Sequence, residues 1–434
     1  MPDLGVVAKE KGIEYFLVSF TDLFGVTRSK LVPASAISDM QVDGAGFAGF
    51  AAHLDMSPAD SDMFGLPDAD AMIQLPWKPE VAWVPSDLYL NGENVGHCPR
   101  STLKRILARA GEGGHDVKSG VECEFFLLSP DGKSLADGAD TRQKPCYDQQ
   151  AVMRRYDFIT ELCNHMQTLG WGPYQNDHED ANGQFEQNWG YGDALETADR
   201  HVFYKYMVKT LAERHGFRAT FMPKPIPNLT GNGCHVHVSV WDKVTGDNLM
   251  QDASGELGLS KTAYNFIGGL LDHAPSLTLI TNPVVNSYKR INAPRTTSGA
   301  TWAPNTVTYS GNNRTHMIRV PDDNRIEVRL ADGAANPYLL QSAVIGAGLH
   351  GIANNTDPGE RYDIDMYAEG HLVKEAPRLP LNMVDALSLF EKSAVLPTIL
   401  GEELCRSYAK LKHLEWNDFT QHFSEWEHAN AIDA

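Results

Sequence analysis

Apolar and polar residues alternate along several short segments of the chain, a period of two that is typical of half-buried strands. The segments "EYFLVSF" and "VTRSKLV" flank a turn at residues 22–25 and predict a hairpin near the start. Further strands are predicted at "EVAWVPS", "VECEFFLLS", "GQFEQNW", "CHVHVSVW" and "RIEVRLA". The first hundred residues show little helical periodicity and many Gly and Asp residues, so they predict a small β-rich unit.

A spacing of three to four residues between apolar positions predicts helices after Cys98. The first, "CPRSTLKRILARAGEGG", has Ser101 as its expected N-cap and ends at a pair of glycines. Others are predicted over "DQQAVMRRYDFITELCNHMQTLG", "ETADRHVFYKYMVKTLAERHG" and "NPYLLQSAVIGAGLHGIANN", the last with Pro337 in its first turn. We therefore expect domains of residues 1–97 and 98–434, the larger of which is mixed α/β or α+β.

Composition excludes several classes of protein. The chain has 434 residues, of which 42% are hydrophobic and 21% charged, as is ordinary for a globular protein. A net charge of -19 argues against a general nucleic-acid surface, which needs clustered Lys and Arg. No apolar run reaches the ~18 residues of a membrane span, and no signal peptide is recognisable at the start. The six cysteines form no CxxC pair, which favours free thiols and a cytoplasmic location.

Charged residues interrupt the predicted strands at a period of two. Glu122 and Glu124 point to one face of their strand, where two like charges raise each other's proton affinity unless a cation holds them together. Two more strands align polar residues in the same way, and two carboxylates flank a Gly-containing turn. These are His235, His237 and Ser239; Arg325, Glu327 and Arg329; and Glu179 with Glu186.

For any one of these segments, an open polar sheet face explains the pattern equally well. Together they predict a sheet lined with carboxylates and one imidazole, a ligand set that favours Mg²⁺ or Mn²⁺ over zinc. Such metals combined with several arginines are typical of phosphoryl-transfer sites. No Walker-type loop and no kinase motif set is present.

Longer motifs resemble the glutamine synthetase family. "KPIPNLTGNGCHVHVS" is similar to the ATP-region signature of that family, and "FTDLFGVTRSK", "NSYKRI", "GNNRTHMIRVP" and "RIEVRLADGAANPYL" resemble other family segments in the same order. The resemblance implies an N-terminal β-grasp-like domain and a catalytic domain with a curved antiparallel sheet flanked by helices. It also implies active sites between subunits, in a dodecamer of two stacked hexameric rings.

The resemblance further implies a reaction and the residues that perform it. ATP phosphorylates the γ-carboxylate of glutamate, and an amine then displaces phosphate. The implied roles are Glu124, Glu179 and Glu186 for one metal; Glu122, His235 and Glu327 for the other; Gly231, His235, Arg290 and Arg329 for glutamate; and His237, Ser239, Arg314 and Arg319 for ATP, with Arg314 also at the transferred phosphoryl group.

One segment departs from the family pattern. Glutamine synthetases carry a Glu in a flap after the "NSYKR" segment, whereas "INAPRTTSGATWAP" contains no carboxylate between Arg290 and Asn305. Ammonium has four donors and no apolar surface, so several carboxylates hold it best. Small residues here leave room for a carbon substituent, and Trp302 could contact an alkylammonium through cation–π attraction. The segment resembles the branch that forms γ-glutamylmethylamide from methylamine.

We therefore expect an enzyme that ligates methylamine to glutamate. The base that deprotonates the amine is predicted among Asp177, which replaces a family His, Asp43, expected to reach the site across a subunit boundary, and Glu186. The alternatives are a glutamine synthetase that uses ammonia, a ligase for another amine such as putrescine, and a non-catalytic relative, which the intact ligand set argues against. The expected partners are small molecules, with no nucleic acid and no membrane.

Overall fold

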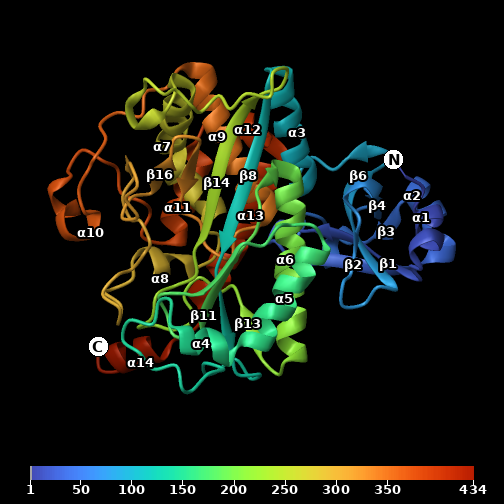
Figure 1. Ribbon diagram of the computed structural model, residues 1–434, viewed down its shortest axis with the longest axis horizontal. Coiled ribbons are helices and arrows are strands. Elements are labelled where there is room, and N and C mark those ends of the chain that lie inside the picture. Colours follow the sequence, from blue (N-terminus) through green and yellow to red (C-terminus); the bar gives the residue numbers. More distant parts are fainter. Residues whose placement is uncertain (1) are drawn as a thin grey trace.

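The computed structural model describes residues 2–434 and shows a small β-rich part beside a larger α/β part (Figure 1). The smaller part is built on seven strands with the order β2-β1-β6-β4-β3, in which β5 and β7 also pair with β6. These strands are β1 Tyr15–Thr21, β2 Thr27–Pro33, β3 Ala45–Phe47, β4 Met63–Pro67, β5 Ile73–Gln74, β6 Val81–Leu90 and β7 Glu93–Asn94. The predicted hairpin is confirmed, because β1 and β2 pair antiparallel from Tyr15 opposite Pro33 to Thr21 opposite Thr27.

Alternation along β6 lets this sheet bury both of its faces. Ala82 and Val84 pack in a small core with helices α1 (Leu4–Lys11) and α2 (Ile37–Asp43). Val81 and Trp83 belong instead to the main core of the larger part. The N-terminal sheet is therefore sandwiched between its own short helices and the rest of the molecule.

Two further sheets form the framework of the larger part. One has the order β12-β8-β14-β17-β16-β15 and the other β10-β11-β9-β13. All their pairs are antiparallel except β15 with β16. The strands are β8 His115–Cys123, β9 Phe125–Leu128, β10 Gln175–His178, β11 Gln184–Asn188, β12 Gly192–Asp193, β13 Arg218–Thr220, β14 Cys234–Asp242, β15 Tyr309–Ser310, β16 Ile318–Asp322 and β17 Arg325–Val328.

The prediction of one continuous strand over "VECEFFLLS" was wrong. The chain leaves the six-stranded sheet at Cys123, the end of β8, and joins the four-stranded sheet at Phe125, the start of β9. Glu124 stands at the junction, where its backbone N–H donates to the carbonyl of Gly233 at 3.1 Å. The apolar pattern continues through this position because both strands are buried, so it could not reveal the change of sheet.

Helices cover the sheets, and α3 and α6 pack on β8 while α7 packs on β17. In Figure 1, β8 and β14 run through the centre of the larger part, between α6 on one side and α8 and α11 on the other. The helices are α3 Pro99–Glu112, α4 Gln149–Arg154, α5 Tyr156–Thr168, α6 Ala194–Arg214, α7 Lys261–Thr281, α8 Ser287–Ile291, α9 Pro337–Asn354, α10 Met366–Glu369, α11 Met383–Lys392, α12 Leu396–Leu400, α13 Glu402–Gln421 and α14 Glu425–Ala431. Among residues 2–434, none of the helices is sufficiently long and apolar to traverse a membrane.

Two predicted helix details were wrong and one is confirmed. Cys98, not Ser101, occupies the N-cap position of α3. The reason is Pro99, whose fixed φ suits the first helical position. The helix predicted from residue 148 is divided into α4 and α5 at Arg155, which has φ -114° and ψ 15°. Pro337 does begin α9, and the side chain of Asn336 caps it.

A buried arginine on α3 joins the two parts of the molecule. Arg100 is 2% exposed, and its guanidinium donates to Asp199 on α6 at 3.0 Å, to Asp87 on β6 at 3.0 Å and to Asp68 at 2.9 Å. One cation therefore compensates carboxylates from the N-terminal sheet and from the larger part. Removing it would leave these carboxylates in a poorly hydrated interior, which is costly.

We expect Arg100→Met to lower the free energy of unfolding by about 3–5 kcal/mol, the range found when one partner of a buried ion pair is removed. Denaturant unfolding monitored by circular dichroism measures this loss. Arg142→Met is the matched control, since Arg142 pairs with Asp148 at the surface and its loss should cost less than about 1 kcal/mol. Equal stability of the two variants would contradict the assigned role of Arg100.

Candidate active site

Three strands of the six-stranded sheet bring Glu122, His235 and Glu327 together. β14 lies between β8 and β17, with His235 opposite Glu122 and His237 opposite Glu327. Nδ1 of His235 is 3.5 Å from a carboxylate oxygen of Glu122 and 3.5 Å from one of Glu327. One ligand atom of each of the three residues lies within 4.8 Å of the others. These residues form one predicted ligand set, and the structure places them side by side.

A second group lies next to the first and consists of Glu124, Glu186 and His235, again with ligand atoms within 4.8 Å of one another. The sequence analysis expected Glu179 in this group rather than His235. The carboxylate of Glu179 instead accepts a hydrogen bond from the backbone N–H of Asp180 at 3.1 Å. Glu179 is nevertheless connected to Glu124 through Gln184, which accepts from the backbone N–H of Glu179 at 2.9 Å and donates to the Glu124 carboxylate at 2.8 Å. It borders the second group.

The acidic cluster, which comprises both groups and Glu179, is unfavourable without a cation. Burial, reinforced by neighbouring carboxylates, raises the pKa of Glu179 and of Glu186 well above the ordinary value. Burial also raises the pKa of Glu124 to about 7. Nε2 of His235 is buried and has no hydrogen-bond partner among residues 2–434. Carboxylate oxygens around a free imidazole nitrogen fit Mg²⁺ or Mn²⁺.

Arginines border the acidic cluster on the side of β16 and β17. Arg319 and Arg329 each donate to Glu327, at 2.6 Å and 2.5 Å. In spite of burial, the positive charge of Arg329 keeps the pKa of Glu327 low, at about 2. Arg290, on α8, is 2% exposed. Arg314 is exposed on the loop before β16, so its predicted contact with a phosphoryl group stays a prediction.

Two glycines allow this close packing. A Cβ atom on Gly231 would lie 2.2 Å from the carbonyl oxygen of Pro223, which explains the glycine that the sequence analysis selected. On Gly233 it would lie 2.9 Å from Nε2 of His235 and 3.0 Å from Nη2 of Arg290. Gly233 was missed, although its position in "GNGCH", two residues before His235, was a signal. Any side chain there would enter the space between the acidic cluster and Arg290.

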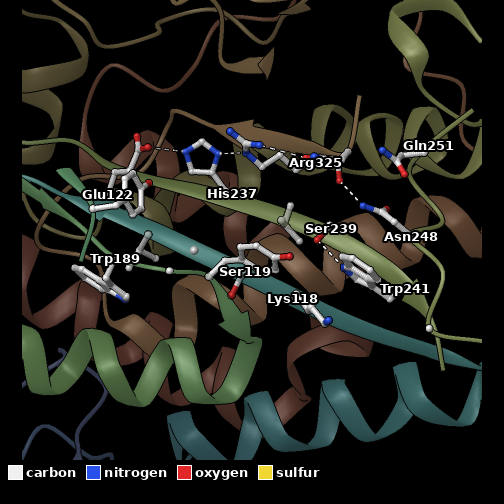
Figure 2. A pocket seen from close by; sticks show the side chains of 18 of the residues that line it. Lys118, Ser119, Glu122, Trp189, His237, Ser239, Trp241, Asn248, Gln251 and Arg325 are labelled. Atoms are coloured by element: carbon white, nitrogen blue, oxygen red, sulfur yellow. Dashed lines mark hydrogen bonds and ion pairs between the residues drawn. The ribbon is translucent and has the colours of Figure 1, made fainter. Parts of the chain in front are cut away.

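A cavity of about 650 Å³ opens along β8 and β14 beyond Glu122, and Figure 2 shows the side chains that line it. The predicted His237 and Ser239 are in its wall. Nε2 of His237 lies 3.0 Å from Glu122, and Ser239 accepts a hydrogen bond from the indole of Trp241 at 2.8 Å. The volume of the cavity is in the range of small-molecule sites. The cavity therefore has the size and position for a nucleotide next to the acidic cluster.

Three residues of this cavity were missed as site residues. Arg325 donates to Nδ1 of His237 at 3.2 Å, and the ammonium group of Lys118 lies 4.1 Å from the centre of the Trp241 ring. Arg325 could have been found, because it shares the period of two with Glu327. Lys118 and Trp241 had no such signal, since they meet only through the pairing of β8 with β14.

The segment of residues 291–305, here called the flap, is tied to the turn between β10 and β11. The hydroxyl of Ser298 donates to a carboxylate oxygen of Asp180, and Thr230 donates to the same oxygen at 2.6 Å. The backbone N–H of Thr297 donates to the carbonyl of Asn228 at 3.0 Å. Asp180 was also missed, although it directly follows Glu179. It brings a carboxylate to a flap that has none of its own.

The three candidate bases differ in their surroundings. Asp177 pairs across the strands with Glu186, and burial and two neighbouring carboxylates raise its pKa to about 6. The Oδ1 atom of Asp177 is buried and finds no hydrogen-bond partner in the described part of the chain. Asp43 is exposed at the end of α2, in the N-terminal part and away from β8 and β14 (Figure 1). Within one chain, the structure therefore brings Asp177 and Glu186 together, but not Asp43.

Comparisons with known proteins identify the family of the chain. Residues 96–431 match the family model of the glutamine synthetase catalytic domain. A glutamine synthetase from Rhizobium leguminosarum bv. phaseoli is 61% identical over 99% of both chains, and a glutamate–methylamine ligase from Methyloversatilis universalis is 40% identical over 96% of both. A solved complex of GmaS with ADP is 60% identical and has a TM-score of 0.96, and the match extends over 100% of both chains. GmaS without ligand is 58% identical, with a TM-score of 0.95.

These similarities extend over the whole chain, and they include the strands that carry the acidic cluster. The chain therefore belongs to the glutamine synthetase family and is an ATP-dependent glutamate–amine ligase.

Proposed function

We propose that the amine is methylamine, and that the enzyme forms γ-glutamylmethylamide, ADP and phosphate through a γ-glutamyl phosphate intermediate. The observation that carries this proposal is the flap, which lies at Asp180 and contributes hydroxyl groups but no carboxylate of its own. The similarity to GmaS and to the glutamate–methylamine ligase supports it. A glutamine synthetase that uses ammonia is the second candidate, favoured by the 61% identical Rhizobium relative.

The acidic cluster is proposed to hold two divalent ions, Mg²⁺ or Mn²⁺. Glu122, His235 and Glu327 would hold one, and Glu124 and Glu186, with Glu179 beside them, the other. When bound, such ions neutralise phosphate oxygens and favour phosphoryl transfer.

Other residues are proposed to place the two remaining substrates. The cavity lined by His237, Ser239 and Arg325 would bind the nucleotide, with Arg314 and Arg319 directed at its phosphates. Arg290 and Arg329 would bind the carboxylates of glutamate, because a guanidinium matches the geometry of a carboxylate. Gly231 would let the backbone approach this substrate closely.

Asp177 is the proposed base for the second half-reaction. A methylammonium ion must lose a proton before its nitrogen can attack the acyl phosphate. With a pKa of about 6, Asp177 is ionised at neutral pH and basic enough to take that proton. The nitrogen then bonds to the acyl carbon and the bond to phosphate breaks. Glu186, opposite Asp177, is the alternative base, and Asp43 of a neighbouring subunit would help to bind the cation.

Several larger features stay predictions. They are a β-grasp-like N-terminal domain, a domain boundary near Cys98, a curved antiparallel catalytic sheet, active sites shared between subunits of a homo-dodecamer, a cytoplasmic location, and the lack of nucleic-acid and membrane partners.

We expect kcat/KM for methylamine to exceed that for ammonia by about tenfold or more, because a methyl group in a matching pocket is worth about 1–3 kcal/mol. Phosphate release with ATP, Mg²⁺ and glutamate measures this, with methylamine, ammonia, putrescine or no amine. A higher value for ammonia would identify the enzyme as a glutamine synthetase instead.

We expect Asp180→Asn to uncouple the reaction. The amide oxygen of Asn can still accept from Ser298 and Thr230, but a neutral hydrogen bond is weaker than one to a carboxylate by about 1–1.5 kcal/mol, so the flap should open about five- to tenfold more often. Water then reaches the acyl phosphate, and phosphate release without amine rises relative to amide formation. Asp131→Asn, at an exposed turn, is the control and should leave that ratio unchanged. The same ratio in both variants would show that Asp180 does not hold the flap.

We expect metal-free protein to lose stability as the pH rises from 5 to 8. Glu124 and Asp177 have a higher pKa in the folded protein than in the unfolded chain, so folding takes up protons in this range. Mg²⁺ at a hundred times its Kd should stabilise the protein by about 2.7 kcal/mol at pH 8 and by less at pH 5. Thermal unfolding measures both effects. Glu186→Gln should reduce them, and an unchanged response of that variant would contradict the ligand assignment.

A further inference from the structure

Two cysteines face each other directly beneath the acidic cluster. Cys123 lies between Glu122 and Glu124 at the end of β8, and Cys234 lies next to His235 at the start of β14. Because neighbouring residues of a strand point to opposite faces, both thiols lie on the far side of the sheet from the carboxylates. There they approach His201 of α6, whose Nε2 is 3.9 Å from Sγ of Cys234. Both cysteines are 0% exposed, and neither has a role in the proposed ligase reaction.

The backbone around these cysteines has the geometry that a cross-strand disulfide needs. Cys123 and Cys234 are register partners in the pairing of β8 with β14. The backbone N–H of Cys234 donates to the carbonyl of Ala331, away from β8. The bond next to the cysteine pair runs from the N–H of Glu124 to the carbonyl of Gly233. They are thus a non-hydrogen-bonded antiparallel pair, in which Cα atoms lie about 4.5 Å apart and side chains are closest. That separation lies within the range of disulfides.

The sulfur atoms are already near each other. Sγ of Cys123, Sγ of Cys234 and a ring nitrogen of His201 lie within 4.8 Å of one another. An S–S bond measures about 2.0 Å, so the sulfurs need to approach by less than about 3 Å, which rotation of the two side chains can supply. The remaining cysteines, Cys98, Cys146, Cys163 and Cys405, belong to no such group within residues 2–434.

A metal ion is the other ligand that two thiols and an imidazole could hold. Structural zinc sites use four protein ligands, whereas this group offers three. The ammonium group of Lys205, on the same helix as His201, lies near enough to influence both thiols electrostatically. A fixed positive charge at this position disfavours a dication. The observations therefore favour sulfur–sulfur bonding.

We propose that Cys123 and Cys234 form a disulfide in the folded protein when a peroxide is present. One thiol attacks a peroxide oxygen, which gives a sulfenic acid and, with hydrogen peroxide, one water. The second thiol attacks the sulfenic sulfur, the S–S bond forms, and a second water leaves. Two thiols and one hydrogen peroxide thus become one disulfide and two waters.

The disulfide lowers ligase activity because of its place in the sheet. Glu122 and Glu124 flank one cysteine, and His235 follows the other, so a change in either Cα–Cβ direction shifts these three side chains. Displacement of a catalytic group by about 1 Å can cost about a hundredfold in rate. Reduction of the disulfide restores the two free thiols and returns the three side chains to their original positions.

The experiment treats the full-length protein with hydrogen peroxide and analyses non-reduced tryptic peptides by mass spectrometry. We expect a peptide that links Cys123 to Cys234, 2 Da lighter than the two thiol peptides together. Activity should fall by about 10- to 100-fold and return with dithiothreitol. The linked peptide is detected without an activity assay, so this test is independent of the amine that the enzyme uses.

Cys234→Ser and Cys234→Ala should remain active after the same treatment, and two replacements guard against a folding defect in one. Cys98→Ala is the matched control, because Cys98 is also buried but has no partner thiol in the structure, and it should respond like the wild type. Absence of the linked peptide, or equal inactivation of the Cys234 variants, would overturn the proposal. So would one equivalent of zinc bound through both thiols in the purified protein.

Discussion

The mutual repulsion of buried carboxylates around His235 is the constraint on which the rest of the structure depends. Glu122 and Glu124 come from one segment, Glu186 and Glu327 from two others, and all four meet at one imidazole. Arg319 and Arg329 compensate Glu327, but no guanidinium pairs with Glu186 within residues 2–434. The site is therefore prepared for additional positive charge, which the proposed divalent ions would supply.

The same repulsion bears on the choice of amine. A cluster that already holds many carboxylates needs few more to attract a cation, and here the flap adds hydroxyl groups while Asp180 provides the nearby charge. Burial, reinforced by the negative charges of Glu122 and Glu124, raises the pKa of Asp177, so this carboxylate stays basic. Trp302 packs edge-on against Tyr367, with ring centres 6.3 Å apart, so its contact with an alkylammonium stays a prediction. Attraction of the amine and removal of its proton can thus rest on separate carboxylates.

Side chains that alternate in direction along β8 and β14 serve both faces of the six-stranded sheet. On one face this alternation presents the carboxylates and His235 to the substrates, and on the other it presents Cys123 and Cys234 to α6. The site is therefore mechanically connected to the helices behind it. Arg100 extends this connection to the N-terminal sheet, because it binds Asp199 on α6 and Asp87 on β6 with the same guanidinium.

The sequence by itself determined which residues share a strand face, because a period of two is a local property of the backbone. That was enough to align Glu122 with Glu124, His235 with His237 and Ser239, and Arg325 with Glu327 and Arg329, and to predict the N-terminal hairpin. The assignment of Glu122, His235 and Glu327 to one metal, and of His237 and Ser239 to the nucleotide, came from the resemblance to the family. Only the tertiary structure decided that the strand through Glu124 changes sheets, that His235 lies close to both Glu122 and Glu124, and that Asp180 meets the flap. These outcomes depend on strand register and on contacts between segments far apart in the chain, such as Asp180 with Ser298, which no local periodicity encodes.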